Sequence, residues 1–298
     1  MHARVGVHVS IAGGIANSIN NAKKIGCTAF QIFTRNPRGW AAKPLSSKEV
    51  DLFRNNLAAS AIEKSSVAVH MPYLPNLSGP DGEFYRKSVQ ALKEEMHRSK
   101  ELGIPYLVIH LGSHMGRGSK SGIDQLVKAI TSACNSSKSE TGVEVLLENN
   151  AGYKNNVGGT FEEMRVILDR LGNSKQFGVC IDTCHLFASG YDLRTKADVH
   201  TTLERFNEIV GLKELKLVHL NDAKGALGSN LDRHEHIGLG SVGIDGISMF
   251  LSLGPIRRLP IILETPIDKI RGDEQNLKVV LDILKDSSSS NKKSLDPI

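Results

Sequence analysis

The sequence predicts one α/β domain, a closed (β/α)8 TIM barrel, and three observations lead to this prediction. Short apolar runs of strand length alternate with longer segments of helical period, which is typical of βα units and a parallel sheet. Eight such runs occur along the chain. A chain of 298 residues with 40% hydrophobic content is also long enough for one large barrel. An open Rossmann-like sheet is the alternative, but no Gly-x-Gly-x-x-Gly pattern follows the first run.

The expected strands share a short apolar sequence that ends at a polar residue. They are Arg4–His8, Thr28–Phe33, Val67–His70, Tyr106–His110, Val143–Glu148, Gly178–Asp182, Leu215–His219 and Pro260–Glu264. The clearest helix is expected over Phe84–Leu102, with an apolar stripe that includes Phe84 and an opposite polar face that includes Arg98. We expect the barrel to span residues 1–285, and residues 286–298 have the composition of a disordered tail.

Bulk composition limits the classes of function and compartment. The net charge is +5, with 37 Lys and Arg residues spread among 32 Asp and Glu residues, which is a mild indication of a polyanionic partner. The four cysteines form no Cys-x-x-Cys pair and are expected to be reduced and structural. No apolar segment is long enough for a membrane span or a signal sequence. We therefore expect a protein of the cytoplasm that has no membrane partner. We also expect a monomer.

Six consecutive strand ends, from the third strand onward, carry residue types that ligate metals. They are His70, His110, Glu148, Asp182, His219 and Glu264. Any single one has an ordinary explanation, such as a buried imidazole with a backbone partner or an Asp that caps a helix. Six are harder to explain in this way, because the carboxyl ends of barrel strands meet at one face. Three carboxylates crowded there cannot all stay ionised without cations. Mixed nitrogen and oxygen ligands favour zinc, with manganese or iron as alternatives.

A second group of candidate ligands lies outside the strand ends. His185 follows Asp182 by three residues, and Asp232 and His234 lie two residues apart in a glycine-rich loop after the seventh strand. Taken alone, Asp-x-His is more often exposed polar sequence. Together, His185, Asp232 and His234 would supply a separate three-ligand site that leaves coordination positions open for substrate or water. His236 is left out of this site, because two histidines at i and i+2 need not face the same way.

Eight stretches distributed over nearly the whole chain carry a further signal. They are GVHVSIAGG, FTRNPRGW, HMPYLPNL, HLGSH, LENNAG, CIDTCHLFASGYDLRT, HLNDAKGALGSNLDRHEHIGLG and ILET. Together they resemble endonuclease IV, the trizinc apurinic/apyrimidinic endonuclease family. The resemblance implies three Zn²⁺ positions. The first is formed by His70, His110 and Glu148, the second by Glu148 as a bridge with Asp182, His219 and Glu264, and the third by His185, Asp232 and His234.

The resemblance implies a reaction of DNA base excision repair. The phosphodiester on the 5′ side of an abasic site in duplex DNA is hydrolysed, which leaves a 3′-hydroxyl and a 5′-deoxyribose phosphate. Bound cations lower the pKa of water and so provide a nucleophile at neutral pH. Glu148 and Glu264 are the expected catalytic residues, Glu264 by orienting the attacking water.

Three residues match those with which the family contacts DNA. The resemblance implies that Arg38, Tyr73 and Leu74 enter the base stack from the minor groove, which costs about a few kcal/mol of unstacking per step. A missing base lowers that cost, so the lesion itself would contribute to specificity. Without the resemblance, ordinary packing of the loop onto the barrel would be favoured for Tyr73 and Leu74.

Two other functions are alternatives. A metal-dependent sugar isomerase or epimerase uses a similar barrel with His, Asp and Glu at its strand ends, but it needs one or two metals. The second group of ligands and the loops that carry Arg38 and Tyr73 have no role in such an enzyme. A non-catalytic binder of DNA lesions would not need nine intact candidate ligands.

Overall fold

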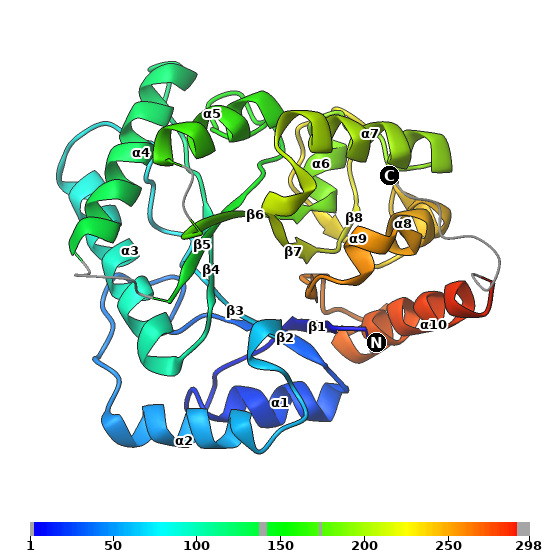
Figure 1. Cartoon of the computed structure of the whole chain (residues 1–298), viewed down its shortest axis with the longest axis horizontal. Helices are drawn as coiled ribbons and strands as arrows, with labels where there is room; N and C mark the ends of the chain where they lie inside the picture. Colours follow the sequence, from blue (N-terminus) through cyan, green and yellow to red (C-terminus); the bar gives the residue numbers. More distant parts are fainter. Residues whose placement is uncertain (1–2, 137–141, 173–174, 291–298) are drawn as a thin grey trace.

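Eight parallel strands close into a barrel in the computed structural model, which describes residues 3–136, 142–172 and 175–290 (Figure 1). The order around the barrel is β1-β10-β7-β6-β5-β4-β3-β2, so the predicted TIM barrel is confirmed. The strands are β1 (Val5–His8), β2 (Ala29–Ile32), β3 (Val67–His70), β4 (Tyr106–His110), β5 (Glu144–Glu148), β6 (Phe177–Asp182), β7 (Leu215–His219) and β10 (Ile261–Leu263). Each overlaps a predicted strand; β3, β4 and β7 have the predicted bounds, and no end of the others differs by more than one residue.

Helices surround the barrel on its outer side (Figure 1). They are α1 (Asn17–Ile25), α2 (Ser47–Ala58), α3 (Glu83–Leu102), α4 (Ser119–Ser136), α5 (Phe161–Leu171), α6 (Thr183–Ala188), α7 (Lys196–Ile209), α8 (Gly243–Ser252), α9 (Gly254–Arg257) and α10 (Asp273–Ser290), with 3-10 turns η1 (Lys64–Ser66) and η2 (Leu212–Glu214). Side-chain caps fix several starts: Ser46 caps α2 with a capping box, and Thr160 and Thr195 cap α5 and α7. Within the described ranges, none of the helices combines the length and the apolar character needed to cross a membrane.

Helix α3 differs from its predicted faces at two residues. Phe84, predicted to lie on the buried stripe, is 51% exposed. Its ring packs edge-on against the ring of Trp40, with 5.2 Å between the two ring centroids. Arg98, predicted to lie on the polar face, is 7% exposed. Its guanidinium is satisfied by the hydroxyl and carbonyl of Thr34 and by the carbonyl of Lys43. Arg98 can therefore be buried, because each of its three guanidinium nitrogens donates a hydrogen bond.

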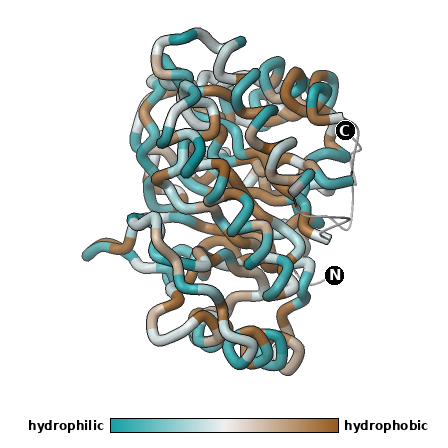
Figure 2. The backbone as a smooth tube through the Cα atoms, turned by 90° about the vertical axis from the view of Figure 1, so that its left-hand side faces the viewer, coloured by the Kyte–Doolittle hydropathy of each residue, from teal (hydrophilic) through white to brown (hydrophobic). Residues whose placement is uncertain are grey.

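The barrel interior is filled by one ring of small and aliphatic side chains. Its members are all 0% exposed: Ala29, Ala68, Val108, Leu146, Cys180, Leu217 and Ile262. Gly6 of β1, the register partner of Ala29, takes the remaining position of the ring, and an added Cβ there would lie 1.7 Å from the carbonyl oxygen of Ala29. Figure 2 shows the hydrophobic segments running through the middle of the molecule, with mixed hydropathy along the helices. Because side chains alternate along a strand, the residues two positions further on point to the same interior, at the carboxyl-end mouth.

The carboxyl-terminal helix is longer than the sequence predicts. α10 runs to Ser290, past the predicted end of the barrel domain at residue 285. Residues 291–298 lie outside the described residues, and the predicted disorder of that segment stays a prediction.

Candidate metal centre at the barrel mouth

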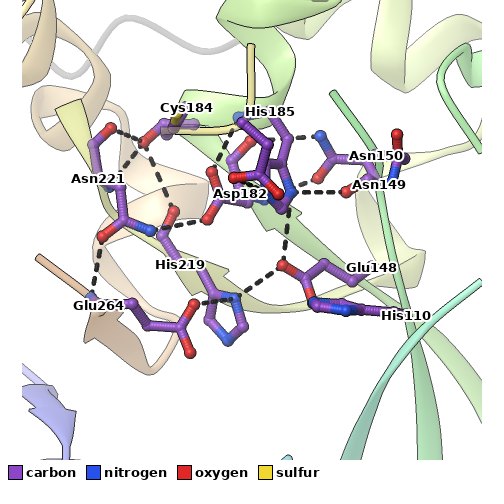
Figure 3. A network of polar contacts seen from close by, with 12 residues as sticks. His110, Glu148, Asn149, Asn150, Asp182, Cys184, His185, His219, Asn221 and Glu264 are labelled. Carbon is purple, nitrogen blue, oxygen red and sulfur yellow. Dashed lines mark hydrogen bonds and ion pairs between the residues drawn. The ribbon is translucent and has the colours of Figure 1, made fainter. Parts of the chain in front are cut away.

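A ring of polar side chains lies directly above the apolar ring of the barrel. Each member is two residues beyond a member of the apolar ring: His8, Gln31, His70, His110, Glu148, Asp182, His219 and Glu264. The structure therefore brings all six predicted strand-end residues together at one mouth. Figure 3 shows several of them converging there, with His185 from α6 and the asparagines Asn149, Asn150 and Asn221 beside them.

Glu148, at the end of β5, lies at the centre of the cluster and is 2% exposed. Its Oε2 is 3.2 Å from Nε2 of both His70 and His110. Its Oε1 is 3.1 Å from Nδ1 of His219 and 3.5 Å from Nδ1 of His185. The two carboxylate oxygens thus face two different sets of imidazoles. The ligand atoms of the first predicted set (His70, His110 and Glu148) lie within 4.8 Å of one another.

The second predicted set consists of Glu148, Asp182, His219 and Glu264, whose ligand atoms also lie within 4.8 Å of one another. His219 is fully buried, and its Nδ1 is 3.2 Å from Oε2 of Glu264. The two carboxylate oxygens of Asp182 accept different hydrogen bonds. Its Oδ1 caps α6 by accepting from the backbone N–H of His185, and its Oδ2 accepts from the amide of Asn221 at 2.7 Å. The capping and ligand interpretations of Asp182 are therefore compatible.

The third predicted set, His185, Asp232 and His234, is assembled from α6 and a loop, and its ligand atoms lie within 4.8 Å of one another. Nε2 of His185 is 3.2 Å from Oδ1 of Asp232. His234 lies in a short antiparallel sheet formed by β8 (Asp222–Ala223) and β9 (His234–Glu235). Asp222 is fully buried and fixes the segment after β9, because its carboxylate accepts hydrogen bonds from the backbone N–H groups of residues 238, 240, 242 and 243.

Cys184 offers an alternative ligand near the third set. Its sulfur lies within the same 4.8 Å limit of ligand atoms of Asp182 and His234. Burial raises the pKa of the Cys184 thiol far above its ordinary value, and the nearby carboxylates raise it further. A thiol must lose its proton to bind a metal, and the raised pKa makes that loss more costly for Cys184.

The protonation of the mouth shows how its charges are balanced. Burial raises the pKa of Glu148, but His110 and His219 outweigh burial and hold that pKa well below its ordinary value. Burial lowers the pKa of His185, but Asp182 and the hydrogen bond to Asp232 outweigh it and raise the pKa to about 10. His110, His185 and His219, whose pKa values are all raised, therefore act as counter-ions of the carboxylates.

The donor set fits divalent cations. Among the described residues, no Lys or Arg forms an ion pair with Glu148, Asp182, Asp232 or Glu264. Nε2 of His234 is buried and has no hydrogen-bond partner, although it lies 3.5 Å from a carboxylate oxygen of Asp182. Neutral imidazoles and ionised carboxylates around metal ions would replace the protonated pairs, which is the ordinary state of mixed N and O metal sites.

The three predicted DNA-contacting residues follow strands at this same face. Arg38 is exposed on a turn after β2, where the side chain of Asn36 accepts from its backbone N–H. Tyr73 is 56% exposed, and its ring lies 6.0 and 5.9 Å from the rings of His70 and His110. Leu74 beside it is half-buried. The prediction that these residues contact DNA is compatible with their positions and stays a prediction.

His236, which was excluded from the ligand sets, has other partners. It is fully buried, and its Nε2 is 3.0 Å from Oδ1 of Asp268 while its Nδ1 is 2.9 Å from the amide of Asn276.

The sequence interpretation missed two members of the mouth ring, His8 and Gln31. Both could have been found by extending the list of strand ends to the first two strands and choosing the inward-facing position of each.

The fold and the residues at its mouth define a class, the xylose isomerase-like TIM barrels, and a family model of that description matches residues 19–287. Within this class the chain belongs to the endonuclease IV family. The protein named "Probable endonuclease 4" from Nitrosopumilus maritimus (strain SCM1) is 50% identical over 275 residues, which cover 92% of this chain and 98% of that protein. Endonuclease IV from Thermus thermophilus has a TM-score of 0.84 and 34% identity, and the match covers 95% of this chain and 99% of that chain.

A solved structure with an epimerase-like name has the same architecture. A D-tagatose 3-epimerase-like protein has a TM-score of 0.72 over 98% of this chain and all of its own, at 18% identity. That likeness shows the fold alone. The barrel fold is common to both enzyme alternatives. The higher sequence identity to the endonuclease relatives, 50% and 34% against 18%, therefore distinguishes them better than the fold does.

Proposed function

We propose that this chain is a zinc-dependent apurinic/apyrimidinic endonuclease of DNA repair. It hydrolyses the phosphodiester on the 5′ side of an abasic site in duplex DNA and leaves a 3′-hydroxyl and a 5′-deoxyribose phosphate. The observation that carries the proposal is the cluster of buried carboxylates and imidazoles at the mouth, in a member of the endonuclease IV family. The proposal includes a monomeric protein that acts in the cytoplasm.

Three metal positions are proposed, filled by Zn²⁺, with Mn²⁺ or iron as alternatives at one or more of them. The ligands are His70, His110 and Glu148 for the first, Glu148, Asp182, His219 and Glu264 for the second, and His185, Asp232 and His234 for the third. When bound, the ions would supply Lewis acidity and lower the pKa of a water molecule at neutral pH. The separate orientations of the two Glu148 oxygens support its proposed role as a bridge.

The side chains at the mouth position the reactants. Glu264 is proposed to orient the attacking water. Its Oε1 accepts from the amide of Gln31 at 2.8 Å, and its Oε2 lies 3.2 Å from Nδ1 of His219, so the carboxylate is held in one orientation. Fixed geometry of this kind lowers the barrier because the reacting groups need not reorganise.

Recognition of the lesion is assigned to Arg38, Tyr73 and Leu74. The exposed ring of Tyr73 stands over His70 and His110, so a residue inserted into the DNA there would bring the adjacent phosphate toward the metal positions. Insertion is easiest where a base is missing, because less stacking is lost.

Incubation with a labelled duplex that carries one abasic site tests the proposal. We expect cleavage on the 5′ side of the site, loss of cleavage with chelator, and recovery when zinc is returned. The metal content of the active protein should be about three zinc ions per chain. Cleavage on the 3′ side, or cleavage that persists in chelator, would contradict the mechanism. Turnover of ketose sugars without cleavage of DNA would favour the epimerase alternative.

A further inference from the structure

We propose that Gln31 is a positioning residue of the metal centre. It selects the tautomer of His219 and the orientation of Glu264, and it thereby sets how tightly the second metal position holds its ion. The inference rests on the proposed function in one respect, namely that the mouth binds divalent ions.

Gln31 lies at the mouth end of β2 and is fully buried. It is a member of the polar ring, two residues beyond Ala29 of the apolar ring. The backbone of β2 pairs with β1 so that Gln31 and His8 are register partners. No metal-ligand role is proposed for the Gln31 side chain. It lies among the ligands as a neutral amide. Its hydrogen-bond donors and acceptor constrain the tautomer of His219 and the orientation of Glu264.

The amide joins two ligands of the second position. Its Oε1 is 2.9 Å from Nε2 of His219, and its Nε2 is 2.8 Å from Oε1 of Glu264. The amide nitrogen is also 3.0 Å from Nδ1 of His8. Each polar atom of the amide therefore has a partner, which fixes the side chain in one orientation.

The chemistry of these partners determines the direction of each bond. An ionised carboxylate can only accept, so the NH2 group of Gln31 must face Glu264. The carbonyl oxygen then faces Nε2 of His219, and that nitrogen must carry a proton to donate to it. The lone pair of a neutral His219 is therefore on Nδ1, the atom that lies 3.1 Å from Glu148 and 3.2 Å from Glu264.

Only this tautomer is competent to ligate an ion in the second set. In the opposite tautomer, two lone pairs would face each other across 2.9 Å, and the proton on Nδ1 would occupy the space of the ion. Partners that orient ligating histidines in this way typically change metal affinity by about 10-fold to 100-fold when they are removed. The second position should therefore depend on Gln31, whereas the first and third positions should not.

Equilibrium metal binding of two variants tests the inference. Q31M keeps most of the volume but removes the acceptor and the donors, and Q31E keeps an acceptor toward His219 but loses the donor to Glu264. The control is Q90M, which removes an exposed glutamine on α3 that also donates to a glutamate, Glu94. Purified proteins are dialysed against zinc buffered at graded free concentrations, and bound zinc is measured by mass spectrometry, without reference to activity.

We expect Q31M to release one of three ions at a free zinc concentration about 10-fold or more above the wild-type value, with the other two ions unchanged. Q31E should lie between Q31M and the wild type, and Q90M should match the wild type. Wild-type affinity in both Gln31 variants would overturn the inference, as would an equal loss at all three positions. Failure of the wild type itself to hold zinc would instead overturn the proposed function, so the two failures are distinguishable.

Discussion

Two clusters of buried charged side chains lie in this molecule, and their charges are balanced in opposite ways. The first, here called the Glu95 cluster, consists of Thr34, Arg35, Glu95 and Arg98 and lies between α3 and the loop after β2. Glu95 is fully buried, forms an ion pair with Arg35 and accepts from the hydroxyl of Thr34 at 2.7 Å. Arg98 binds the same hydroxyl and two carbonyls of the loop. Arg35 also forms an ion pair with Glu94 at 2.8 Å, so two guanidinium groups and two carboxylates of the chain balance one another here.

The second cluster, at the barrel mouth, has carboxylates without such partners. Glu148, Asp182 and Glu264 face imidazoles and amides, and within the described part of the chain none of them forms an ion pair with Lys or Arg. An isolated buried carboxylate is costly, and the pKa values of His185 and His219 are raised so that these two imidazoles hold protons in compensation.

The difference in charge balance distinguishes a structural cluster from a cluster that can bind metal ions. A cluster that is neutral within the chain needs nothing more, and the Glu95 cluster ties the loop that carries Arg38 to α3. A cluster that relies on protonated imidazoles can exchange those protons for metal ions. Perturbed groups of the second kind are the ones expected at a functional site.

The sharpest test of the mouth is the substitution of Glu148 by Gln. E148Q removes the charge that both ligand sets share, so incision of an abasic duplex should fall by about 1,000-fold or more. Binding of a duplex with an abasic analogue should persist, since the loops are unchanged. Single-turnover cleavage and fluorescence anisotropy measure the two quantities.

The matched control for this substitution is E144Q, on the same strand. Glu144 is half-buried at the opposite end of β5 and faces Lys216 at 3.8 Å. E144Q should cleave at nearly the wild-type rate. Undiminished incision by E148Q would remove Glu148 from the proposed mechanism.

Breaking the Glu95 cluster should cost stability and leave the metal sites intact. E95Q leaves two buried guanidinium groups without their buried carboxylate, and loss of one partner in such a pair costs about 3 kcal/mol or more of unfolding free energy. For a chain of this size, that lowers Tm by roughly 5 °C or more. Calorimetry gives Tm, and the zinc content should equal that of the wild type.

An exposed pair on the same helix supplies the control for E95Q. Glu83 pairs with Lys87 at the start of α3, and its side chain is 78% exposed. E83Q should leave the Tm close to the wild-type value, because an exposed ion pair is well solvated. Equal stability of E95Q and E83Q would mean that the Glu95 cluster contributes nothing net.

The two clusters also differ in how far the sequence could predict them. The mouth was predictable because period-two alternation and the known edge of a parallel barrel place strand-end residues together, although His8 and Gln31 were missed. The Glu95 cluster was not predictable, because Glu95 and Arg98 fit a helical polar face as well as any exposed pair. Only the loop packed over α3 decides that they are buried, and that packing is a contact between residues 61 to 64 positions apart.

The pH dependence of the stability of the metal-free protein tests whether the imidazoles of the mouth balance the carboxylates. The pKa of His185 is raised to about 10 in the folded state, against about 6.5 when unfolded. The stability it contributes is therefore complete below about pH 6.5 and is lost as pH rises toward 10. Between about pH 7 and 9, the unfolding free energy of chelator-treated protein should fall by about 2 kcal/mol.

Metal-loaded protein supplies the comparison for this titration. Its imidazoles would be neutral ligands, so this loss should be absent and the difference in Tm between the two forms should widen with pH. Thermal melts at several pH values measure the difference. A constant difference across this range would mean that the imidazoles do not act as counter-ions of the carboxylates.

The smallest expected effect concerns Tyr73, whose exposed ring contacts the imidazoles of the mouth. Y73A should weaken binding to abasic duplex by about 10-fold, or about 1.4 kcal/mol, and binding to intact duplex by much less, because insertion is favoured where a base is missing. Y73F keeps the ring and should lose less than about 2-fold. Zinc content is measured alongside, since the ring lies near His70 and His110. Equal losses on the two duplexes would mean that Tyr73 packs the loop and does not enter the base stack, and lesion specificity would then have to come from the metal centre alone.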